Sequence, residues 1–110
     1  MDTFHALADP TRRKIIEILA RKGQLPATEI YEQFDVSPQA VSQHLKVLRQ
    51  ANLVRVEKQA QQRLYQINPA AMLDLEDWAR QVRQLWNERF DAIEKILEAE
   101  KNKENKNEQE

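Results

Sequence analysis

Hydrophobic residues in the first part of this 110-residue chain recur every three or four positions, which is helical spacing. Asp9 followed by Pro10 is typical of an N-cap and a first helical residue, and Gly23 can end that helix in a left-handed conformation. Thr3 can cap a shorter apolar turn that precedes it. This pattern predicts two N-terminal helices.

A second pair of helices is predicted next, joined by a short turn. The first covers about residues 27–34, and Ser37 with Pro38 then repeats the signal of an N-cap and a first helical residue. The helix that begins there should stop at Asn52, which can adopt the left-handed conformation. The apolar residues that share one face of this helix are Val41, Leu45 and Leu48. Residues 27–51 therefore have the pattern of a helix-turn-helix.

Alternation replaces helical spacing after this motif. Residues 53–59 alternate, with Val54 and Val56 on one side and Arg55 and Glu57 on the other, and residues 63–67 form a second extended run. Together they predict a two-stranded hairpin, or wing, over about residues 53–67. Residues 60–62 form the turn and contain no glycine or asparagine. We therefore expect this turn to be longer than two residues or mobile.

One long helix is predicted for the last part of the chain. Asn68 and Pro69 repeat the cap signal, and helical spacing continues to about Lys101. Residues 102–110 are only Asn, Lys, Glu and Gln, so we expect a disordered polar tail after a single domain over residues 1–101. The apolar stripe of the helix, too long for a small domain to cover, consists of Leu75, Trp78, Val82, Leu85, Trp86, Phe90, Ile93, Ile96 and Leu97.

These elements predict a mostly α fold with a two-stranded β-wing, which is a winged helix-turn-helix with a long C-terminal dimerisation helix over about residues 69–101. With 32% charged and 41% hydrophobic residues, the composition is that of an ordinary globular protein. No apolar run approaches the roughly 18 residues of a membrane span, and no leader peptide opens the chain. We therefore expect a cytoplasmic protein.

Several kinds of chemistry are excluded by what the chain lacks. It has no cysteine, hence no disulfide, thiolate metal site or cysteine nucleophile, and its one glycine forms no phosphate-binding loop. We predict neither enzymatic activity nor a cofactor. Acids along an amphipathic helix are usually a solvated face, so we expect no metal site. The carboxylates that could in principle hold a hard cation are Asp74, Glu76, Asp77, Glu88 and Asp91.

The net charge of −1 conceals a segregated distribution. Residues 1–68 carry ten Lys and Arg against seven Asp and Glu, whereas residues 69–110 carry seven against eleven. Between Gln39 and Tyr65 the only acid is Glu57. The basic residues of that stretch are Lys46, Arg49, Arg55, Lys58 and Arg63. This is the part of the chain most suited to phosphates.

The second helix of the helix-turn-helix carries side chains suited to reading DNA. Gln39 and Gln43 lie one turn apart and can form paired hydrogen bonds to adenine, and Ser42 can donate or accept. Lys46 and Arg49 lie further along, where they suit phosphates. Such side chains also solvate ordinary surface helices, but the capped turn before the helix and the basic hairpin after it favour recognition.

Two stretches of sequence carry a resemblance to a known family. Residues 6–16 read Ala-Leu-Ala-Asp-Pro-Thr-Arg-Arg-Lys-Ile-Ile, and residues 41–48 read Val-Ser-Gln-His-Leu-Lys-Val-Leu, followed by Leu53 and Val54. Over about residues 3–68 the chain closely resembles the ArsR (arsenical-resistance regulator) family of bacterial winged-helix repressors. The resemblance implies a homodimer on double-stranded DNA, with two recognition helices in successive major grooves of an inverted repeat.

Site residues follow from this resemblance and from the patterns above. On the recognition helix we expect DNA contacts from Ser37, Gln39, Ala40, Ser42, Gln43, His44 and Lys46. At the wing and DNA backbone we expect contacts from Arg49, Lys58, Gln61 and Arg63. The length of the apolar stripe favours an intersubunit seam, with the expected interface residues Phe4, Leu7, Leu75, Trp78, Val82, Leu85, Trp86, Arg89, Ile93 and Ile96.

The chain departs from the metal-sensing members of that family. Those members place cysteines on the helix before the turn, where residues 29–34 have none, or use histidine with carboxylates on the last helix. Here the only histidines are His5 and His44, far upstream. The chain thus resembles the cysteine-free branch, which includes autorepressors relieved by a partner protein. A protein inducer or sequestering partner is expected by that analogy alone.

Some assignments stay open at the level of sequence. His44 lies at the edge of the buried stripe, where packing or phosphate bonding is favoured over base reading or a pH switch. Arg12 and Arg13 divide between phosphate contacts and ion pairs with the acidic last helix. The leading hypothesis is a homodimeric repressor that binds, without a metal, an inverted repeat with half-sites about 10 bp apart. The alternative is a protein-interaction module whose C-terminal helix captures another protein.

Overall fold

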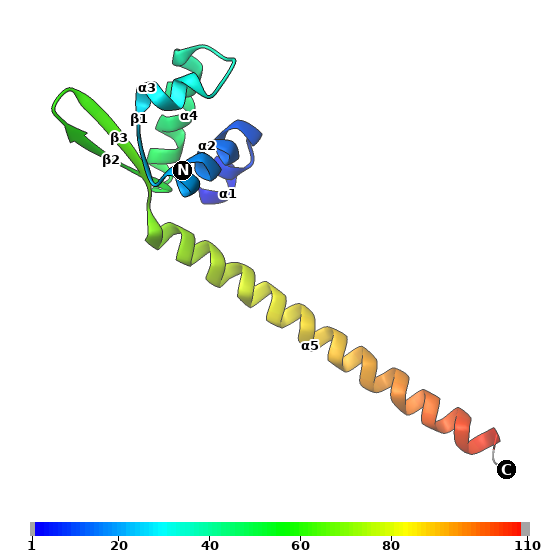
Figure 1. Ribbon diagram of the computed structural model, residues 1–110. Coiled ribbons are helices and arrows are strands. Elements are labelled where there is room, and N and C mark those ends of the chain that lie inside the picture. Colours follow the sequence, from blue (N-terminus) through cyan, green and yellow to red (C-terminus); the bar gives the residue numbers. More distant parts are fainter. Residues whose placement is uncertain (1, 109–110) are drawn as a thin grey trace. The chain divides into compact units, whose positions relative to one another are not determined.

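The computed structural model describes residues 2–108, with side chains to residue 104. The described residues fall into two compact units, one up to Met72 and the other from Leu73 onward. The expectation of a single domain over residues 1–101 stays a prediction. The elements, labelled in Figure 1, are α1 (Thr3–Leu7), α2 (Pro10–Lys22), β1 (Gln24–Pro26), α3 (Ala27–Glu32), α4 (Pro38–Gln50), β2 (Val54–Gln59), β3 (Gln62–Ile67) and α5 (Pro69–Glu108).

Side-chain caps fix where the helices begin. The carboxylate of Asp9 accepts from the backbone N–H of Arg12 at 3.1 Å, and Oγ of Ser37 accepts from the N–H of Ala40 at 3.2 Å. Each cap precedes a proline at the first helical position, as the sequence predicted. The prediction for α1 was wrong by one residue, because Asp2 rather than Thr3 caps it. A carboxylate is as good a cap as a hydroxyl, so both positions were compatible with the pattern.

Among the described residues, three adopt positive φ where the chain reverses. Gly23 (φ 87°) ends α2 and Asn52 (φ 60°) follows α4, which confirms both predicted stops. The third is Ala60 (φ 54°), in the turn between β2 and β3. This turn has two residues, Ala60 and Gln61, so the prediction of a longer turn was wrong. Cross-strand pairing up to Gln59 opposite Gln62 holds the tight turn closed although alanine disfavours its conformation.

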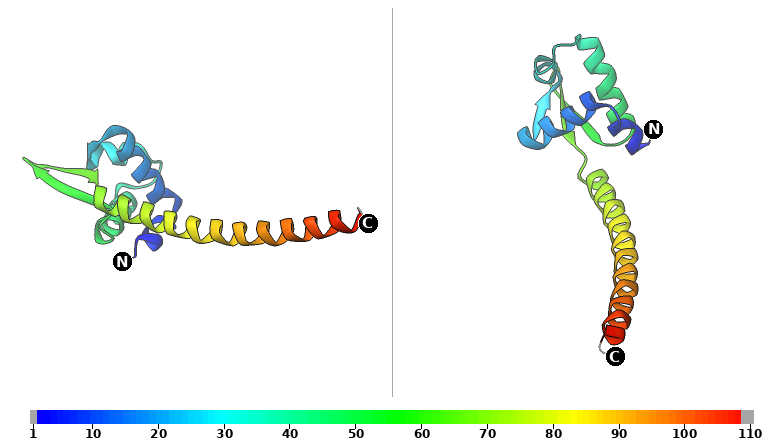
Figure 2. Two further views of the ribbon diagram at one scale, coloured as in Figure 1. Left: turned by 90° about the horizontal axis from the view of Figure 1, so that it is seen from below. Right: turned by 90° about the vertical axis from the view of Figure 1, so that its right-hand side faces the viewer.

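The wing belongs to a three-stranded antiparallel sheet in the order β1-β3-β2. Tyr65 of the central strand pairs with Leu25 on one side and Val56 on the other. The sequence predicted only two strands. β1 was missed because three residues are too short to show alternation, and its Pro26 is tolerated because β1 is an edge strand. The β2–β3 hairpin projects away from helices α1–α4 (Figures 1 and 2).

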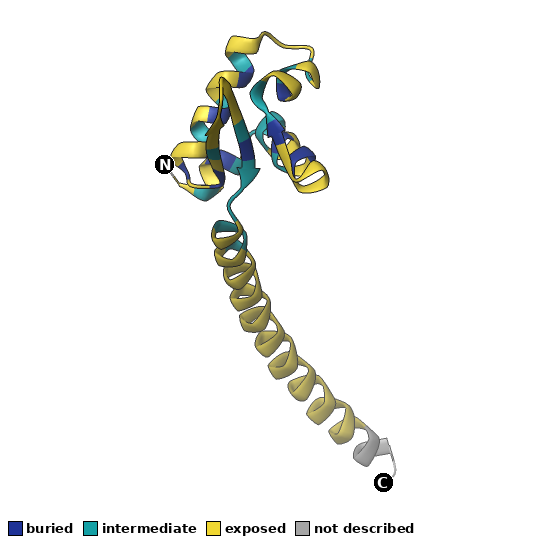
Figure 3. Ribbon diagram, turned by 60° about the vertical axis from the view of Figure 1, so that its left-hand side comes forward, coloured by how far each residue is buried: buried dark blue, intermediate teal, exposed yellow. Residues whose placement is uncertain are grey.

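A single core holds the first unit together, and each fully buried aliphatic side chain in it contributes about 1.5–3 kcal/mol. Ala71 and Met72, in the first turn of α5, pack against this core. Figure 3 shows the buried residues where the helices face the sheet and each other. The side chains with almost no exposure are Ile15, Leu19, Ile30, Val41, Leu45, Leu48 and Leu53.

The helix α5 begins as predicted and ends later than predicted. The side chain of Asn68 accepts from the backbone N–H of Ala70 at 3.3 Å and donates to the carbonyl of Asn52 at 2.8 Å, which ties the start of α5 to the end of α4. The helix then continues to Glu108, through most of the tail that we expected to be disordered, while residues 109–110 lie outside the described part. Acid–base spacing such as Glu98 before Lys101 supports helix beyond the apolar stripe.

Candidate nucleic-acid interface

The recognition helix α4 divides into a buried face and an exposed face. Val41, Leu45 and Leu48 are at most 1% exposed, so the residues between them project to the other side. Residues of the predicted DNA face that are exposed are Ser37, Gln39, Ser42, Gln43, Lys46 and Arg49. Ala40 and His44 are partly buried at its border. The structure therefore brings the predicted recognition-helix residues onto one surface or its edge.

The short helix α3 and the turn after it set the position of α4. Ile30 of α3 is fully buried in the same core as the apolar face of α4. The chain then reverses over residues 33–37, and Ser37 caps α4. Two helices in contact through such a short turn constitute a helix-turn-helix, with the N-terminal residues of the second helix open to a groove.

The wing presents two cations side by side. Lys58 of β2 and Arg63 of β3 are direct partners in the strand register, and both are exposed. Like charges opposite each other on a sheet repel and cost a few tenths of a kcal/mol or more. An anion placed over the pair would relieve that repulsion. Gln61, in the turn next to them, is exposed as well.

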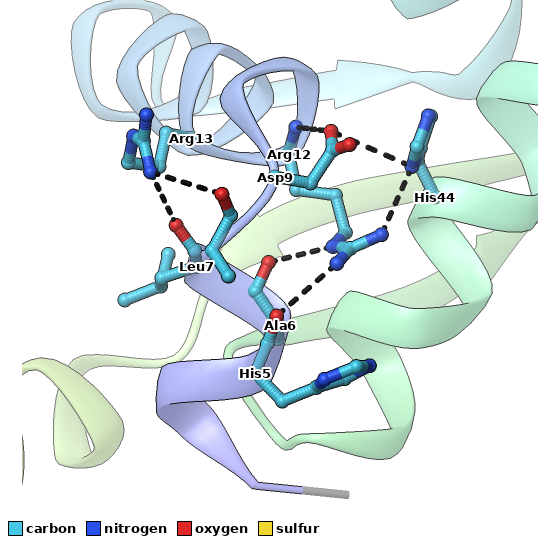
Figure 4. Close-up of polar contacts among 8 residues, drawn as sticks. His5, Ala6, Leu7, Asp9, Arg12, Arg13 and His44 are labelled. Atoms are coloured by element: carbon cyan, nitrogen blue, oxygen red, sulfur yellow. Dashed lines mark hydrogen bonds and ion pairs between the residues drawn. The ribbon is translucent and has the colours of Figure 1, made fainter.

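A polar cluster joins α1, α2 and α4 behind the recognition face (Figure 4). Nη1 of Arg12 lies 3.3 Å from Nδ1 of His44, and Oδ2 of Asp9 lies 3.9 Å from the same nitrogen. Arg12 also donates through Nε to the carbonyl of Ala6 at 2.6 Å and through Nη2 to the carbonyl of His5 at 3.1 Å. His44 is thereby held against α2 rather than projecting freely.

The carboxyl group of Asp9 ionises more readily than an ordinary aspartate. Its partial burial raises the pKa, but the hydrogen bond from the backbone of Arg12 and the electrostatic interactions with His44 and Arg12 outweigh that effect. The pKa of Asp9 is therefore lowered from 3.8. Asp9 serves both as the cap of α2 and as a charge partner for the recognition helix.

Arg12 and Arg13 make intramolecular contacts that the sequence reasoning did not consider. Arg13 donates through Nη1 to the carbonyls of Leu7 at 2.8 Å and Ala8 at 3.3 Å. Arg12 donates in a similar way to the carbonyls of His5 and Ala6. Both side chains satisfy carbonyl groups at the end of α1. The signal that could have revealed this was their place in the first turn of a helix that follows α1 after only two residues.

The predicted dimer residues lie in both units. In the first unit, Phe4 is 46% exposed and Leu7 packs partly against the core. In the second unit, Leu75 is partly buried and Arg89 is exposed. The stripe residues Trp78, Val82, Leu85, Trp86, Phe90, Ile93, Ile96 and Leu97 are between 46% and 65% exposed. The rings of Trp86 and Phe90 meet edge to face at 5.0 Å.

Neither a metal-binding cluster nor a membrane-spanning helix is present in residues 2–108. No group of three or more histidine, aspartate or glutamate side chains among them is placed to hold a metal ion. Over residues 2–108, no helix is both long enough and apolar enough to cross a lipid bilayer.

Known proteins share both the sequence and the fold of this chain. Residues 7–57 match a family described as a helix-turn-helix domain. Over 77 residues the chain is 35% identical to the transcriptional repressor SdpR of Bacillus subtilis, covering 70% of this chain and 84% of that protein. It is 46% identical over 72 residues to the HTH-type transcriptional regulator Rv2034 of Mycobacterium tuberculosis, covering 66% of each. The crystal structure of the ArsR family transcriptional regulator RHA00566 superposes with a TM-score of 0.69 at 31% identity, covering 76% of this chain and 86% of that one.

The fold and the exposed face of α4 define a winged helix-turn-helix DNA-binding protein, as the sequence predicted. Within that class, the chain belongs to the ArsR family of transcriptional regulators. Its relatives and its fold are those of regulators that bind double-stranded DNA, and the protein is not an enzyme.

Proposed function

We propose that this protein is a homodimeric transcriptional repressor that binds an inverted-repeat operator without a bound metal. The observation that carries the proposal is the capped helix α4, which buries one apolar face and exposes Ser, Gln and Lys side chains on the other. A helix of this kind docks its N-terminal residues against base edges in the major groove.

Roles on the DNA follow from side-chain chemistry. Gln39 and Gln43 are one turn apart and exposed, and each can bond an adenine edge. Lys46 and Arg49, toward the end of the same helix, neutralise phosphates and set the register. Lys58 and Arg63, which are paired across the wing, bind phosphate groups of the DNA backbone.

The second copy of the chain is the partner that best fits α5. Leu75, Trp86 and Leu97 are spaced eleven residues apart, as are Val82 and Ile93, so the apolar stripe stays on one side of a nearly straight helix. A stripe of half-exposed large side chains is costly in water unless another chain covers it. Pairing through a twofold axis covers both stripes at once and presents two α4 helices to two half-sites.

Repression without a metal is supported by the relatives and by composition. SdpR is named as a transcriptional repressor, and this chain contains no cysteine to hold a soft metal. In the cytoplasm, a dimer bound at a promoter would prevent the transcription machinery from binding there. A partner protein that binds α5 would release the repressor from DNA, and this form of regulation needs no metal.

Electrophoretic shift with an operator fragment tests the placement of α4. The combined substitution Gln43→Ala and Lys46→Ala should weaken binding by at least about tenfold, since a good base contact and a phosphate contact each contribute on the order of 1 kcal/mol or more. Lys22→Ala, which removes an exposed lysine at the end of α2, is the matched control. Unchanged affinity in the double variant would refute this placement.

Light scattering separates the proposal from its rival. The dimer requires twice the chain mass, whereas a monomer without affinity for heparin would favour a winged helix that serves only as a scaffold for capturing another protein.

A further inference from the structure

Nδ1 of His44 faces two side chains at the N-terminal end of α2, Asp9 and Arg12, and these favour opposite positions for the imidazole proton. Nη1 of Arg12 is 3.3 Å from Nδ1, and Oδ2 of Asp9 is 3.9 Å from it. A guanidinium has only donors, so when His44 is neutral its Nδ1 must accept from Arg12 and its proton must sit on Nε2. A carboxylate has only acceptors, so Asp9 alone would draw the proton to Nδ1 and leave a lone pair on Nε2.

The shorter contact decides which proton position prevails. Arg12 is the nearer partner and is itself fixed, because its Nε and Nη2 donate to the carbonyls of Ala6 and His5. Asp9 has another donor, the backbone N–H of Arg12 at 3.1 Å. Asp9 and Arg12 are also the charged groups that face the ring from α2, and α1 contributes carbonyl oxygens there.

The other ring nitrogen, Nε2, points away from this cluster in Figure 4. The side chain of His44 is 25% exposed, at the border between the buried and exposed faces of α4. A ring recessed in this way reaches less far than Gln43 and is suited to the DNA backbone beside the groove. Phosphate oxygens only accept hydrogen bonds, so Nε2 can bind one only if it carries a proton.

We propose that Arg12 is a positioning residue that holds His44 in the Nε2–H tautomer, so that His44 donates a hydrogen bond to a DNA phosphate at the edge of the recognition helix. The inference rests on the proposed DNA binding by α4. It adds that a residue of α2, which itself does not touch DNA, sets the hydrogen-bonding character of a residue that does.

The tautomer can be measured without DNA. In the ¹⁵N-labelled full-length protein above neutral pH, long-range ¹H–¹⁵N spectra should show His44 with its proton on Nε2. In Arg12→Met the Nδ1–H form should increase, because Asp9 is then the nearest partner. A wild-type His44 protonated on Nδ1 would overturn the proposal, whatever the result on DNA.

Two isosteric substitutions test the role on DNA. The amide nitrogen of glutamine can stand where Nε2 does, and that of asparagine where Nδ1 does. His44→Asn should therefore lose about tenfold more affinity for an operator fragment than His44→Gln, because only glutamine can place a donor where Nε2 meets the charged phosphate. Equal losses would overturn the assignment of Nε2 as the donor. If the substitutions reduce affinity for the operator but not for random DNA, His44 contacts a base instead, and the phosphate assignment is overturned.

A double-mutant cycle separates positioning from structure. Arg12→Met should weaken binding about tenfold when residue 44 is histidine and by much less when His44→Gln is present, because an amide needs no tautomer to be fixed. The same loss in both backgrounds would assign Arg12 a purely structural role in holding α1. If the wild-type protein binds no DNA while the spectra show the Nε2–H form, the proposed function fails and the tautomer assignment stands.

Discussion

Asp9 shows how one residue serves both stability and function. It caps α2 through the N–H of Arg12 and lies near His44 of the recognition helix. Its pKa is lowered from 3.8 in the folded protein, so the stabilisation it gives is present above pH 3.8 and is lost as the pH falls through the lower folded value. The protein should therefore lose part of its stability under strongly acid conditions for a reason that can be assigned to one carboxyl group.

We predict that Asp9→Ala lowers the free energy of unfolding at pH 7 by about 1 kcal/mol, the usual contribution of an N-cap. The difference from wild type should shrink at a pH well below 3.8, where the wild-type carboxylate is protonated. Urea denaturation at the two pH values measures both quantities. Glu17→Ala, an exposed position on the same helix, should change little at either pH. A difference that is constant with pH would contradict the electrostatic part of the account.

The backbone conformation of Ala60 destabilises the folded protein. Its φ of 54° lies in the left-handed region, which costs a residue with a Cβ about 1–2 kcal/mol. Ala60→Gly should therefore stabilise the protein by about 0.5–1 kcal/mol, after allowing for the greater freedom of glycine in the unfolded chain. Thermal or chemical denaturation would measure the change.

The control for that substitution is Ala20→Gly, in the exposed face of α2. The same chemical change should there destabilise by about 1 kcal/mol, because the backbone is helical. Destabilisation at both positions would show that the turn does not adopt the conformation described.

At the scale of elements, the sequence predicted most of the fold because its signals are local. Asp9, Ser37 and Asn68 each accept a hydrogen bond from the backbone at a helix start, and Gly23 and Asn52 adopt the positive φ expected of helix stops. These features depend on residues within one turn. The sequence therefore contained enough information to place α2, α4 and the start of α5.

What the sequence did not predict depends on contacts between distant segments. β1 exists because Leu25 pairs with Tyr65, forty positions later, and three residues carry no pattern of their own. The Arg12–His44 contact likewise joins residues 32 positions apart. The exposed face of α4 could be predicted, because the buried stripe of that helix determines which side chains are exposed, whereas the partners of His44 could not.

The two cations of the wing should contribute to the salt dependence of DNA affinity. Lys58→Ala combined with Arg63→Ala should reduce the slope of log affinity against log salt by about 0.9 for each lost phosphate contact, or about 1.8 per subunit. Sequence preference should stay the same, because phosphate contacts carry no base information. Lys14→Ala with Lys22→Ala, on α2, removes the same charge and serves as the control. A changed consensus with an unchanged slope would place the wing against bases instead.

At the scale of the molecule, the central question is what covers the apolar stripe of α5. The helix has 40 residues and spans about 60 Å at 1.5 Å per residue. Its apolar stripe therefore runs along many turns of the helix. Its side chains from Trp78 to Leu97 are at least 46% exposed in the single chain. Self-association of this helix would account for the stripe and for the symmetry of an operator together.

Ile93→Glu should convert the dimer to a monomer at about 10 µM protein, since a charge buried at the centre of the seam cannot be solvated. DNA binding should fall with it, because a monomer engages one half-site. Sedimentation or light scattering measures the first effect and electrophoretic shift the second. Gln84→Glu, on the opposite side of α5, should leave the dimer intact. A variant that stays dimeric would remove α5 from the interface.

Operator symmetry can be measured by selecting bound sites from random DNA with the purified full-length protein. We predict enrichment of an inverted repeat whose half-site centres lie about 10 bp, or about 34 Å, apart. Enrichment of an asymmetric single site, or of no sequence at all, would contradict this prediction.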